Sequence, residues 1–386
     1  TTKLHPQFSA RYSSTLPVAI PALAILPTME WLLTLGTQII LSLVGVSGQL
    51  AVLLDGAATA ESETIATATP LPSLPGNSPE RDVIPRILLE NPAYQQASLA
   101  NSQGLIGGAA TSNPAEALVN VFCTYRTPDS IRYTTGTGFF VTPTGVILTN
   151  AHVAQFLLLE TVSETGTTEC VVRHGDPAVP TYEAELLYIS PMWIKEHANL
   201  IDDPEPKGTG ERDYALLYLT GGVDSTPLPA QLPFLAVDTE LRNRNTVGNT
   251  VSIAGYPTLD PDLLVRGGAL ERARATTTLV DLYTFDTNYG DIYFLGGSAI
   301  GKQGISGGPV IDQDNEAVAL IVTRGDDSRQ GAGSLNAITL SYIDRTITEE
   351  TGFSLAQTMS GNITYKAYVF QQTLVPFLAA MLEREL

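Results

Sequence analysis

The sequence predicts an all-β domain, preceded by a transmembrane helix and followed by C-terminal helices. From Ala115 onward, short β-like runs alternate with turn residues, and glycine (33) and proline (25) are plentiful. The runs form two series, which indicates a domain in two parts. Hydrophobic residues make up 44% of the 386 residues, enough for a substantial core. We place this domain at residues 113–345 and the helical extension at 346–386.

The first 55 residues contain a long apolar run, residues 31–54, without a charged side chain. A run of this length spans the ~30 Å hydrocarbon core as a helix. Because Lys3 and Arg11 precede it, the positive-inside rule places the N-terminus in the cytoplasm and the rest outside. We therefore expect a single-pass anchor in the cell membrane. A signal peptide cut near residues 58–60 is the alternative, and would give a secreted protein. A buried soluble helix is the third reading.

Residues 56–112 are rich in Ala, Thr, Ser, Pro and Gly. Such a composition buries too little apolar surface to offset the entropy of ordering. The sequence therefore predicts a flexible linker, with a short helix near residues 84–90. At the other end, residues 368–386 carry apolar side chains near helical spacing, which favours packing on the barrel. A contact with a partner or a membrane is the alternative there.

The two series of β-like runs can be followed in order along the chain. The first occupies residues 119–126, 137–142, 145–150, 170–175, 183–189 and 214–220. The second occupies residues 250–256, 269–280, 291–296, 309–313 and 317–323. Breaks such as the Pro-Thr-Gly string at 143–145 fall where hairpin turns belong. From about Ser341 the pattern becomes helical.

Charge and cysteine content exclude two classes of function, nucleic-acid binding and a four-cysteine zinc site. The formal net charge is −19 and no Lys/Arg cluster stands out, so the chain lacks the basic face that a nucleic-acid binder needs. The two cysteines, Cys123 and Cys170, cannot make a four-ligand zinc site. An extracytoplasmic location favours a disulfide between them, with two buried free thiols as the alternative.

Three short strings carry the candidate chemistry. His152 follows an apolar strand, and histidine is the most frequent general base near neutral pH. Asp213 opens an apolar run, where a carboxylate needs a hydrogen-bond partner such as an imidazole N–H. Ser306 stands between glycines that allow a sharp turn and an exposed hydroxyl. Taken singly, each residue has an ordinary structural explanation: a core histidine, a turn or cap aspartate, and a glycine-rich hairpin.

The order of the three strings separates two hydrolase classes. Residues 304–308 also fit G-x-S-x-G, the nucleophile elbow of α/β-hydrolases, whose chain order is Ser, acid, His. No histidine follows Ser306. The order here is His, Asp, Ser, which matches the chymotrypsin arrangement.

The strings TNAHV (149–153), RDYALLYL (212–219) and GISGGPV (304–310) resemble those of trypsin-like peptidases, most closely the bacterial HtrA-like branch. The resemblance covers residues 115 to 345. It implies two six-stranded antiparallel β-barrels of the chymotrypsin type, with the site between them. It also implies a His152, Asp213, Ser306 triad, an oxyanion hole from the Gly304 and Ser306 amides, and no metal or organic cofactor.

The expected activity is that of a membrane-anchored extracytoplasmic serine endopeptidase acting on polypeptides. A non-catalytic scaffold on a protease fold, or an esterase-type hydrolase of the same fold, are the alternatives. The sequence leaves the oligomeric state open.

By the same resemblance, Ile300 lines the floor of the specificity pocket, and Thr323, Arg324 and Gly325 form the edge that pairs with substrate. With no carboxylate at Ile300, we expect a small or medium apolar side chain before the cut rather than Lys or Arg.

Two features depart from the family pattern, and a few other residues are expected to have structural roles only. Ile305 stands where digestive proteases carry an aspartate for a new N-terminus, so that activation route is not expected. Only about 40 residues follow the barrels, so we expect no PDZ domain. The acidic residues 202–205 lack a regular calcium-ligand spacing, and we expect a solvated loop there rather than a metal site. His174 and His197 are expected in loops.

Overall fold

The computed structural model describes residues 86–99, 107–161, 166–201, 203, 208–258, 269–285 and 289–386. The chain divides into two compact units, Thr1–Ala68 and Thr69–Leu386, and the described residues all belong to the second. The predicted membrane run, its alternative cleavage site and most of the acidic residues 202–205 lie outside them. Among the described helices, none combines the length and apolar character needed to cross a membrane.

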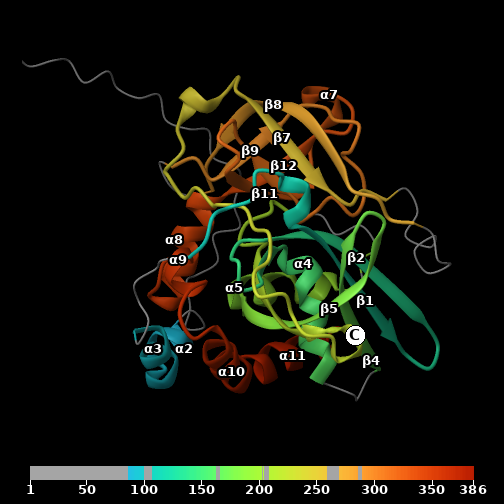
Figure 1. The fold of residues 1–386 in the computed structure, drawn as a ribbon, viewed down its shortest axis with the longest axis vertical. Helices are drawn as coiled ribbons and strands as arrows, with labels where there is room; N and C mark the ends of the chain where they lie inside the picture. Colours follow the sequence, from blue (N-terminus) through green and yellow to red (C-terminus); the bar gives the residue numbers. More distant parts are fainter. Residues whose placement is uncertain are drawn as a thin grey trace, which may run out of the picture. The chain divides into compact units, whose positions relative to one another are not determined.

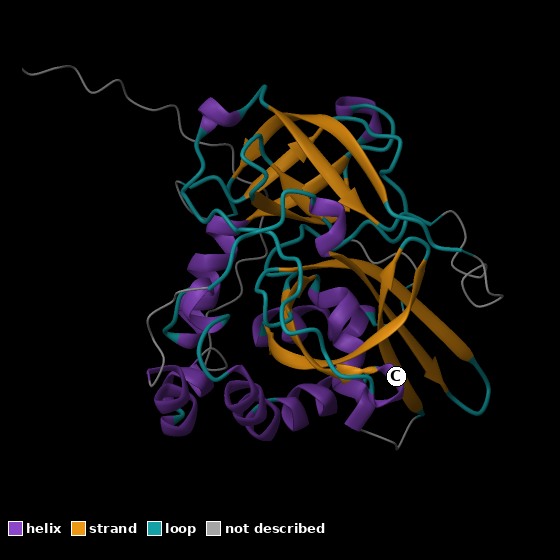
Figure 2. Cartoon of the chain, viewed as in Figure 1, coloured by secondary structure: helices purple, strands orange, loops and turns teal. Residues whose placement is uncertain are grey.

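Twelve strands close into two antiparallel barrels, as the sequence predicted (Figures 1 and 2). The first barrel has the strand order β1-β2-β3-β6-β5-β4 and the second β10-β11-β12-β9-β8-β7. The first six strands are β1 (Leu118–Arg126), β2 (Ile131–Phe140), β3 (Val146–Thr149), β4 (Thr167–Gly175), β5 (Ala178–Ile189) and β6 (Ala215–Gly222). The others are β7 (Thr250–Gly255), β8 (Ala273–Tyr283), β9 (Ile292–Leu295), β10 (Pro309–Ile311), β11 (Ala317–Arg324) and β12 (Leu335–Thr339).

The sequence predicted the first six strands but only five of the second series, because β12 was missed. Its residues, LNAIT, run directly into a helix and carry no turn signal before that junction. β12 nevertheless closes the second barrel, since it pairs with both β11 and β9. Closure depends on this long-range pairing, which no local pattern announces.

A disulfide joins Cys123 on β1 to Cys170 on β4, where the two residues face each other in register. It is the pairing favoured by the sequence. Both residues lie on strands of the first barrel, as expected, and Cys123 is buried in the core. The bridge therefore links two neighbouring strands, and it lies on the opposite side of β1 from β2.

Helices surround the first barrel. Two short helices connect strands of the first barrel along the chain: α4 (Ala151–Ala154) follows β3, and α5 (Pro191–His197) follows β5. Helix α7 (Asp327–Gln330) stands between β11 and β12 of the second barrel. The C-terminal segment forms α8 (Leu340–Thr351), α9 (Leu355–Thr358), α10 (Ile363–Thr373) and α11 (Val375–Glu383). In α10 and α11, Phe370, Leu378 and Leu382 are fully buried, so this segment packs on the domain as predicted.

Most of the predicted linker, residues 56–112, lies outside the described residues, and its described part contains two helices. Its short helix is present as α2 (Arg86–Glu90), but a second helix, α3 (Pro92–Leu99), follows it. Leu88 and Tyr94 are each 1% exposed and join the main core. The composition of this segment did not predict the second helix. Two buried side chains are enough to hold the short polar helices against the C-terminal segment, α2 against α8 and α3 against α10.

The two histidines expected in loops lie in regular structure instead. His174 is on β4, and His197 ends α5, where its Nδ1 contacts the Trp193 carbonyl oxygen at 3.0 Å and its ring stacks on the indole. Both are parts of the scaffold.

Candidate active site

His152 lies directly after a buried strand. β3 ends at Thr149, and the single-turn helix α4 begins at Ala151, which places the imidazole at the rim of the first barrel. Its Nδ1 is 2.7 Å from Oδ2 of Asp213, and its backbone N–H donates to Oδ1 of the same carboxylate over 2.9 Å. The Asp213 carboxylate therefore contacts His152 through both of its oxygen atoms. A proton on Nδ1 leaves the lone pair of the neutral imidazole on Nε2.

The environment of the His152–Asp213 pair favours the protonated form of the imidazole. The His152 side chain is 26% exposed and that of Asp213 only 6%. Burial by itself lowers the pKa of His152, but the charge of Asp213 and its hydrogen bond outweigh burial and raise the pKa above its ordinary value. Asp213 thus stabilises the imidazolium that forms when His152 accepts a proton.

Asp213 owes its direction to the chain on either side of it. It lies two residues before β6, and its backbone carbonyl accepts a hydrogen bond from Nδ2 of Asn150 at 2.9 Å. Its own N–H donates to the Gly210 carbonyl at 3.2 Å. Arg212, just before it, has a φ of 54°, in the left-handed region. The chain therefore turns sharply at Arg212 and delivers the carboxylate to His152.

Ser306 stands in a tight turn before β10. Gly304 and Gly307 have φ values of 82° and 84°, which favour glycine. A Cβ at Gly307 would lie 1.9 Å from the Thr137 carbonyl oxygen, so this backbone passes directly against the first barrel. The amides of Ile305, Gly307 and Gly308 all donate to backbone carbonyls. Those of Gly304 and Ser306 donate to no acceptor within the described part of the chain. They are the two donors expected in the oxyanion hole.

Thr137 on β2 fastens this turn to the first barrel, a role that the sequence did not reveal. Its N–H donates to the Ser306 carbonyl at 2.7 Å, and its hydroxyl donates to the Gly304 carbonyl at 2.6 Å. The hydroxyl also accepts from the Tyr256 N–H at 2.9 Å, and its carbonyl accepts from the Thr149 hydroxyl at 2.8 Å. Thr137 is fully buried. The small-residue string TTGTG at 134–138 was the only signal that could have pointed to it.

Strand β2 brings the two parts of the site together. Gly136 lies against Val153, the residue after His152, since a Cβ there would come within 2.4 Å of the valine Cγ2. The next residue, Thr137, bonds to Ser306. Across the described residues, neither the Ser306 hydroxyl nor Nε2 of His152 is engaged in a hydrogen bond. The structure joins His152 to Asp213, and through Thr137 of β2 it holds the Ser306 turn against the same barrel.

The predicted substrate residues divide between core and surface. Ile300 is 9% exposed and packs in the core of the second barrel. Beside it, Gly301, Lys302, Arg324 and Gly333 border an open hollow of about 670 Å³. Lys302 and Arg324 bring two positive charges to its lining, and the Arg324 guanidinium lies 3.9 Å from the Asp327 carboxylate.

Thr323 and Arg324 pair with β12 on one side only, because β10 ends its pairing with β11 at Leu320. Gly325 continues this edge and donates to the Ser334 carbonyl at 2.9 Å. Within the described chain, the opposite side of this stretch pairs with no strand, so an extended peptide has room to add there.

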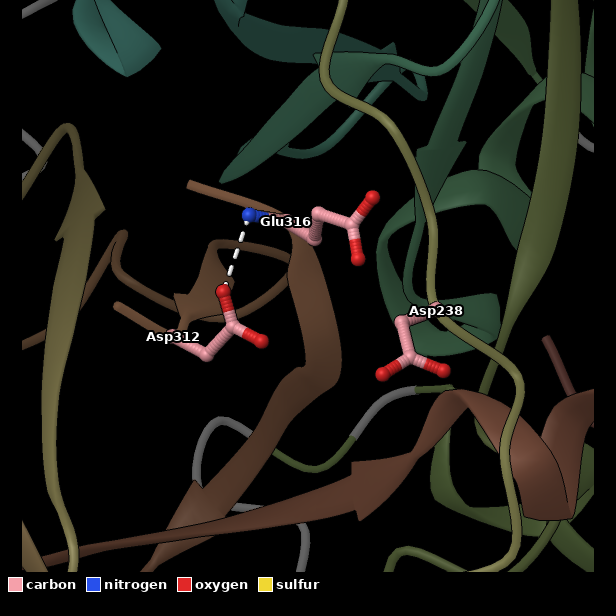
Figure 3. A group of neighbouring side chains, drawn as sticks. All are labelled: Asp238, Asp312 and Glu316. Atoms are coloured by element: carbon pink, nitrogen blue, oxygen red, sulfur yellow. Dashed lines mark hydrogen bonds between the residues drawn. The ribbon is translucent and has the colours of Figure 1, made fainter. Parts of the chain in front are cut away.

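One group of carboxylates has the spacing of a metal site. Asp238, Asp312 and Glu316 place oxygen atoms within 4.8 Å of one another (Figure 3). A cation already serves this group, because Arg242 pairs with Asp238. Asp312 Oδ1 is also occupied, accepting from the Glu316 N–H at 3.0 Å. These contacts account for the group as part of a β-turn and an ion pair.

Comparisons with known proteins gave a family match and a similar solved structure. The sequence model of the trypsin-like peptidase domain matches residues 136–320, a range that contains His152, Asp213 and Ser306. No curated protein matches the sequence. Among solved structures, the chain is similar to the crystal structure of the Rv3671c protease from M. tuberculosis in its active form. The identity is 18% and the TM-score 0.36, over 76% of this chain and 96% of that chain.

Proposed function

We propose that this chain, whose residues 136–320 match the trypsin-like peptidase domain, is a serine endopeptidase with His152, Asp213 and Ser306 as its triad. Two observations carry the proposal: His152 and Asp213 share two hydrogen bonds, and the Gly304 and Ser306 amides of the glycine-rich turn donate to no acceptor among the described residues. These are the base, the orienting acid and the oxyanion donors that acyl transfer needs.

In the proposed reaction, Ser306 Oγ attacks the scissile carbonyl while Nε2 of His152 removes its proton. Asp213 holds the imidazole in the tautomer that makes this transfer possible and stabilises the imidazolium. The Gly304 and Ser306 amides receive the oxyanion, where losing one donor costs about 10²–10³-fold in rate. His152 then gives its proton to the leaving amine, and water releases the acyl group by the same steps in reverse order.

Substrate binding would use the open edge of β11. A peptide added beside Thr323, Arg324 and Gly325 gains backbone hydrogen bonds in a β arrangement. Ile300 offers no carboxylate for a basic side chain, and Lys302 and Arg324 repel one from the rim of the hollow. The preferred residue before the cut is therefore a small or medium apolar one, and Lys or Arg is disfavoured.

The proposal extends to the cellular location on the strength of the sequence. Residues 31–54 are uncharged and long enough to span a bilayer. Anchored there, with Lys3 and Arg11 inside, the catalytic domain faces the extracytoplasmic space. Extraction of membranes at alkaline pH tests this part: an anchored protein stays in the pellet, and recovery of the full-length chain in the supernatant contradicts the anchor.

The catalytic proposal is tested by labelling with a fluorophosphonate probe, which reacts with an activated serine. The wild type should be labelled and Ser306→Ala should not, while both keep the same circular dichroism spectrum. A peptide-library digest beside a panel of esters then separates peptidase from esterase activity. Labelling that persists in Ser306→Ala, or a wild type that cleaves only esters, would overturn the endopeptidase proposal.

A further inference from the structure

Three consecutive residues before β6 face two different parts of the protein. Asp213 turns toward His152, whereas Arg212 and Tyr214 on either side contact helix α8. The Tyr214 hydroxyl lies 2.9 Å from the Thr346 hydroxyl, and the Arg212 N–H donates to the Tyr342 hydroxyl at 3.2 Å. The catalytic carboxylate is thus flanked by two anchors on the same helix.

Glu350 on α8 is the strongest of these anchors. Its side chain is 1% exposed and lies beneath the Arg212 guanidinium, whose Nη1 donates to Oε1 at 2.6 Å. The Ser190 hydroxyl donates to the same oxygen at 3.0 Å, and the Tyr188 hydroxyl donates to Oε2. Burial raises the pKa of the Glu350 carboxyl, and the facing Arg212 charge works against that rise. Both carboxylate oxygens therefore accept hydrogen bonds.

A gain in stability alone does not explain the buried Arg212–Glu350 ion pair. A buried ion pair is often no more stabilising than well-packed apolar side chains of the same volume. Arg212 also holds a left-handed backbone conformation, which is unfavourable for a residue with a Cβ. Strained or buried polar groups of this kind concentrate near functional sites. Here the strained residue is the immediate neighbour of Asp213.

We propose that Glu350, acting through Arg212, is a positioning residue that fixes the left-handed turn and thereby aims the Asp213 carboxylate at His152. The inference rests on the proposed peptidase function for its kinetic consequence, but its structural claim concerns only the His152–Asp213 contact. Neither Glu350 nor Arg212 is expected to touch substrate.

The position of α8 in the chain adds a second consequence. The helix begins at Leu340, directly after β12 of the second barrel, with Thr339 capping it through a 3.1 Å bond from the Tyr342 N–H. The Arg212–Glu350 pair therefore ties the acid of the first barrel to an element that grows out of the second. Through this pair, helix α8 links the Asp213 side of the site to the second barrel, which carries Ser306.

The test replaces Glu350 by glutamine, which keeps the shape and removes the charge. We expect Glu350→Gln to lower kcat by about 10²-fold, the effect of a displacement near 1 Å at a catalytic group, with KM nearly unchanged. The pKa of His152 should fall, since a displaced Asp213 no longer raises it. Only four histidines are present, so the imidazole can be followed by NMR and assigned with His152→Ala.

Glu349→Gln is the matched control. Glu349 also contacts Arg212, at 3.1 Å, but its side chain is 56% exposed. Water screens such a contact, so kcat and the His152 pKa should stay near the wild-type values. If Glu350→Gln and Glu349→Gln behave alike in both measurements, the positioning role of Glu350 is wrong.

A second variant guards against misfolding. Removing one partner strands a buried charge, whereas Arg212→Met with Glu350→Met removes both. This double variant should fold, as judged by circular dichroism and thermal unfolding, and should still show the loss of kcat and the lowered His152 pKa. Wild-type values of both would overturn the inference. A wild type without peptidase activity, but with a His152 pKa that falls in these variants, would sink the proposed function and leave the positioning role intact.

Discussion

The two sides of the candidate active site are held by different forces. On the first barrel, His152 and Asp213 are joined by hydrogen bonds, and the Arg212–Glu350 ion pair stands next to Asp213 in the chain. On the second, the Ser306 turn is fixed by backbone hydrogen bonds and by glycines packed against Thr137. The first side should therefore respond to charge and pH, and the second to added volume. The predictions below separate these two sensitivities.

The largest effect is expected on the charged side, from Asp213→Asn. Asparagine keeps the shape but favours the wrong tautomer of His152, and in triads of this type that change costs about 10⁴-fold in kcat. It also removes the cause that raises the His152 pKa. Steady-state kinetics on a peptide substrate measure the loss. The control is Asp224→Asn, an exposed aspartate whose left-handed φ of 58° suits asparagine. Equal activity of the two variants would contradict the assigned acid.

On the packed side, Gly307→Ala should lower kcat by about 10²-fold. The new Cβ would meet the Thr137 carbonyl oxygen at 1.9 Å, so the turn must shift, and a shift near 1 Å at Ser306 has that effect on rate. The same variant should lose stability in a urea titration, because a φ of 84° also strains alanine.

Gly248→Ala separates the two causes. Gly248 has a similar φ of 92° but open space around its Cα. We expect it to cost about 1–3 kcal/mol of stability from backbone strain, with kcat per folded molecule unchanged. If both glycine variants lose activity to the same extent, close packing at Gly307 is not what positions Ser306.

The pH profile sharpens the comparison, since only the charged side titrates near neutrality. His152 acts as a base when neutral, and its pKa is raised above 6.5. The acid limb of kcat/KM should therefore lie above pH 6.5, falling about tenfold for each pH unit below it. The same raised pKa lets protonated His152 stabilise the fold below its unfolded pKa, a contribution lost as pH rises through the folded value. An acid limb at or below 6.5 would contradict the coupling to Asp213.

The same contrast explains what the sequence could predict. His152, Asp213 and Ser306 lie in local strings whose residue types and chain order carry their chemistry, so they could be named before any coordinates. The strands of the first barrel were also predicted, because each has its own apolar run and turn. What these features share is that the information lies within a few neighbouring residues.

The supporting contacts could not be predicted for the opposite reason. Thr137 and Gly304 are 167 positions apart, and Arg212 and Glu350 are 138 apart. Each residue looks ordinary in its own segment, and only the closed barrels bring the partners together. β12 was missed for a related cause, because its pairing partners and not its own composition make it a strand. Long-range packing thus decided the details that local pattern left open.

The smallest effect is expected at the junction of the two sides, from Thr137→Val. Valine keeps the volume but removes the hydroxyl that donates to the Gly304 carbonyl and accepts from the Tyr256 N–H. The Thr137 N–H still holds Ser306, so the turn should loosen without collapsing. One net hydrogen bond is worth about 1 kcal/mol, which corresponds to about a fivefold lower kcat if all of it is lost in positioning.

Thr134→Val on the same strand is the matched control, because its side chain makes no hydrogen bond within the described structure. Thr137→Ser, which restores the hydroxyl, should recover most of the activity. If Thr137→Ser is as slow as Thr137→Val, the methyl group and not the hydroxyl fixes the turn. The Ser306 turn would then depend on backbone hydrogen bonds and packing, with no side-chain hydrogen bond from Thr137, and its contrast with the charged side would be even greater.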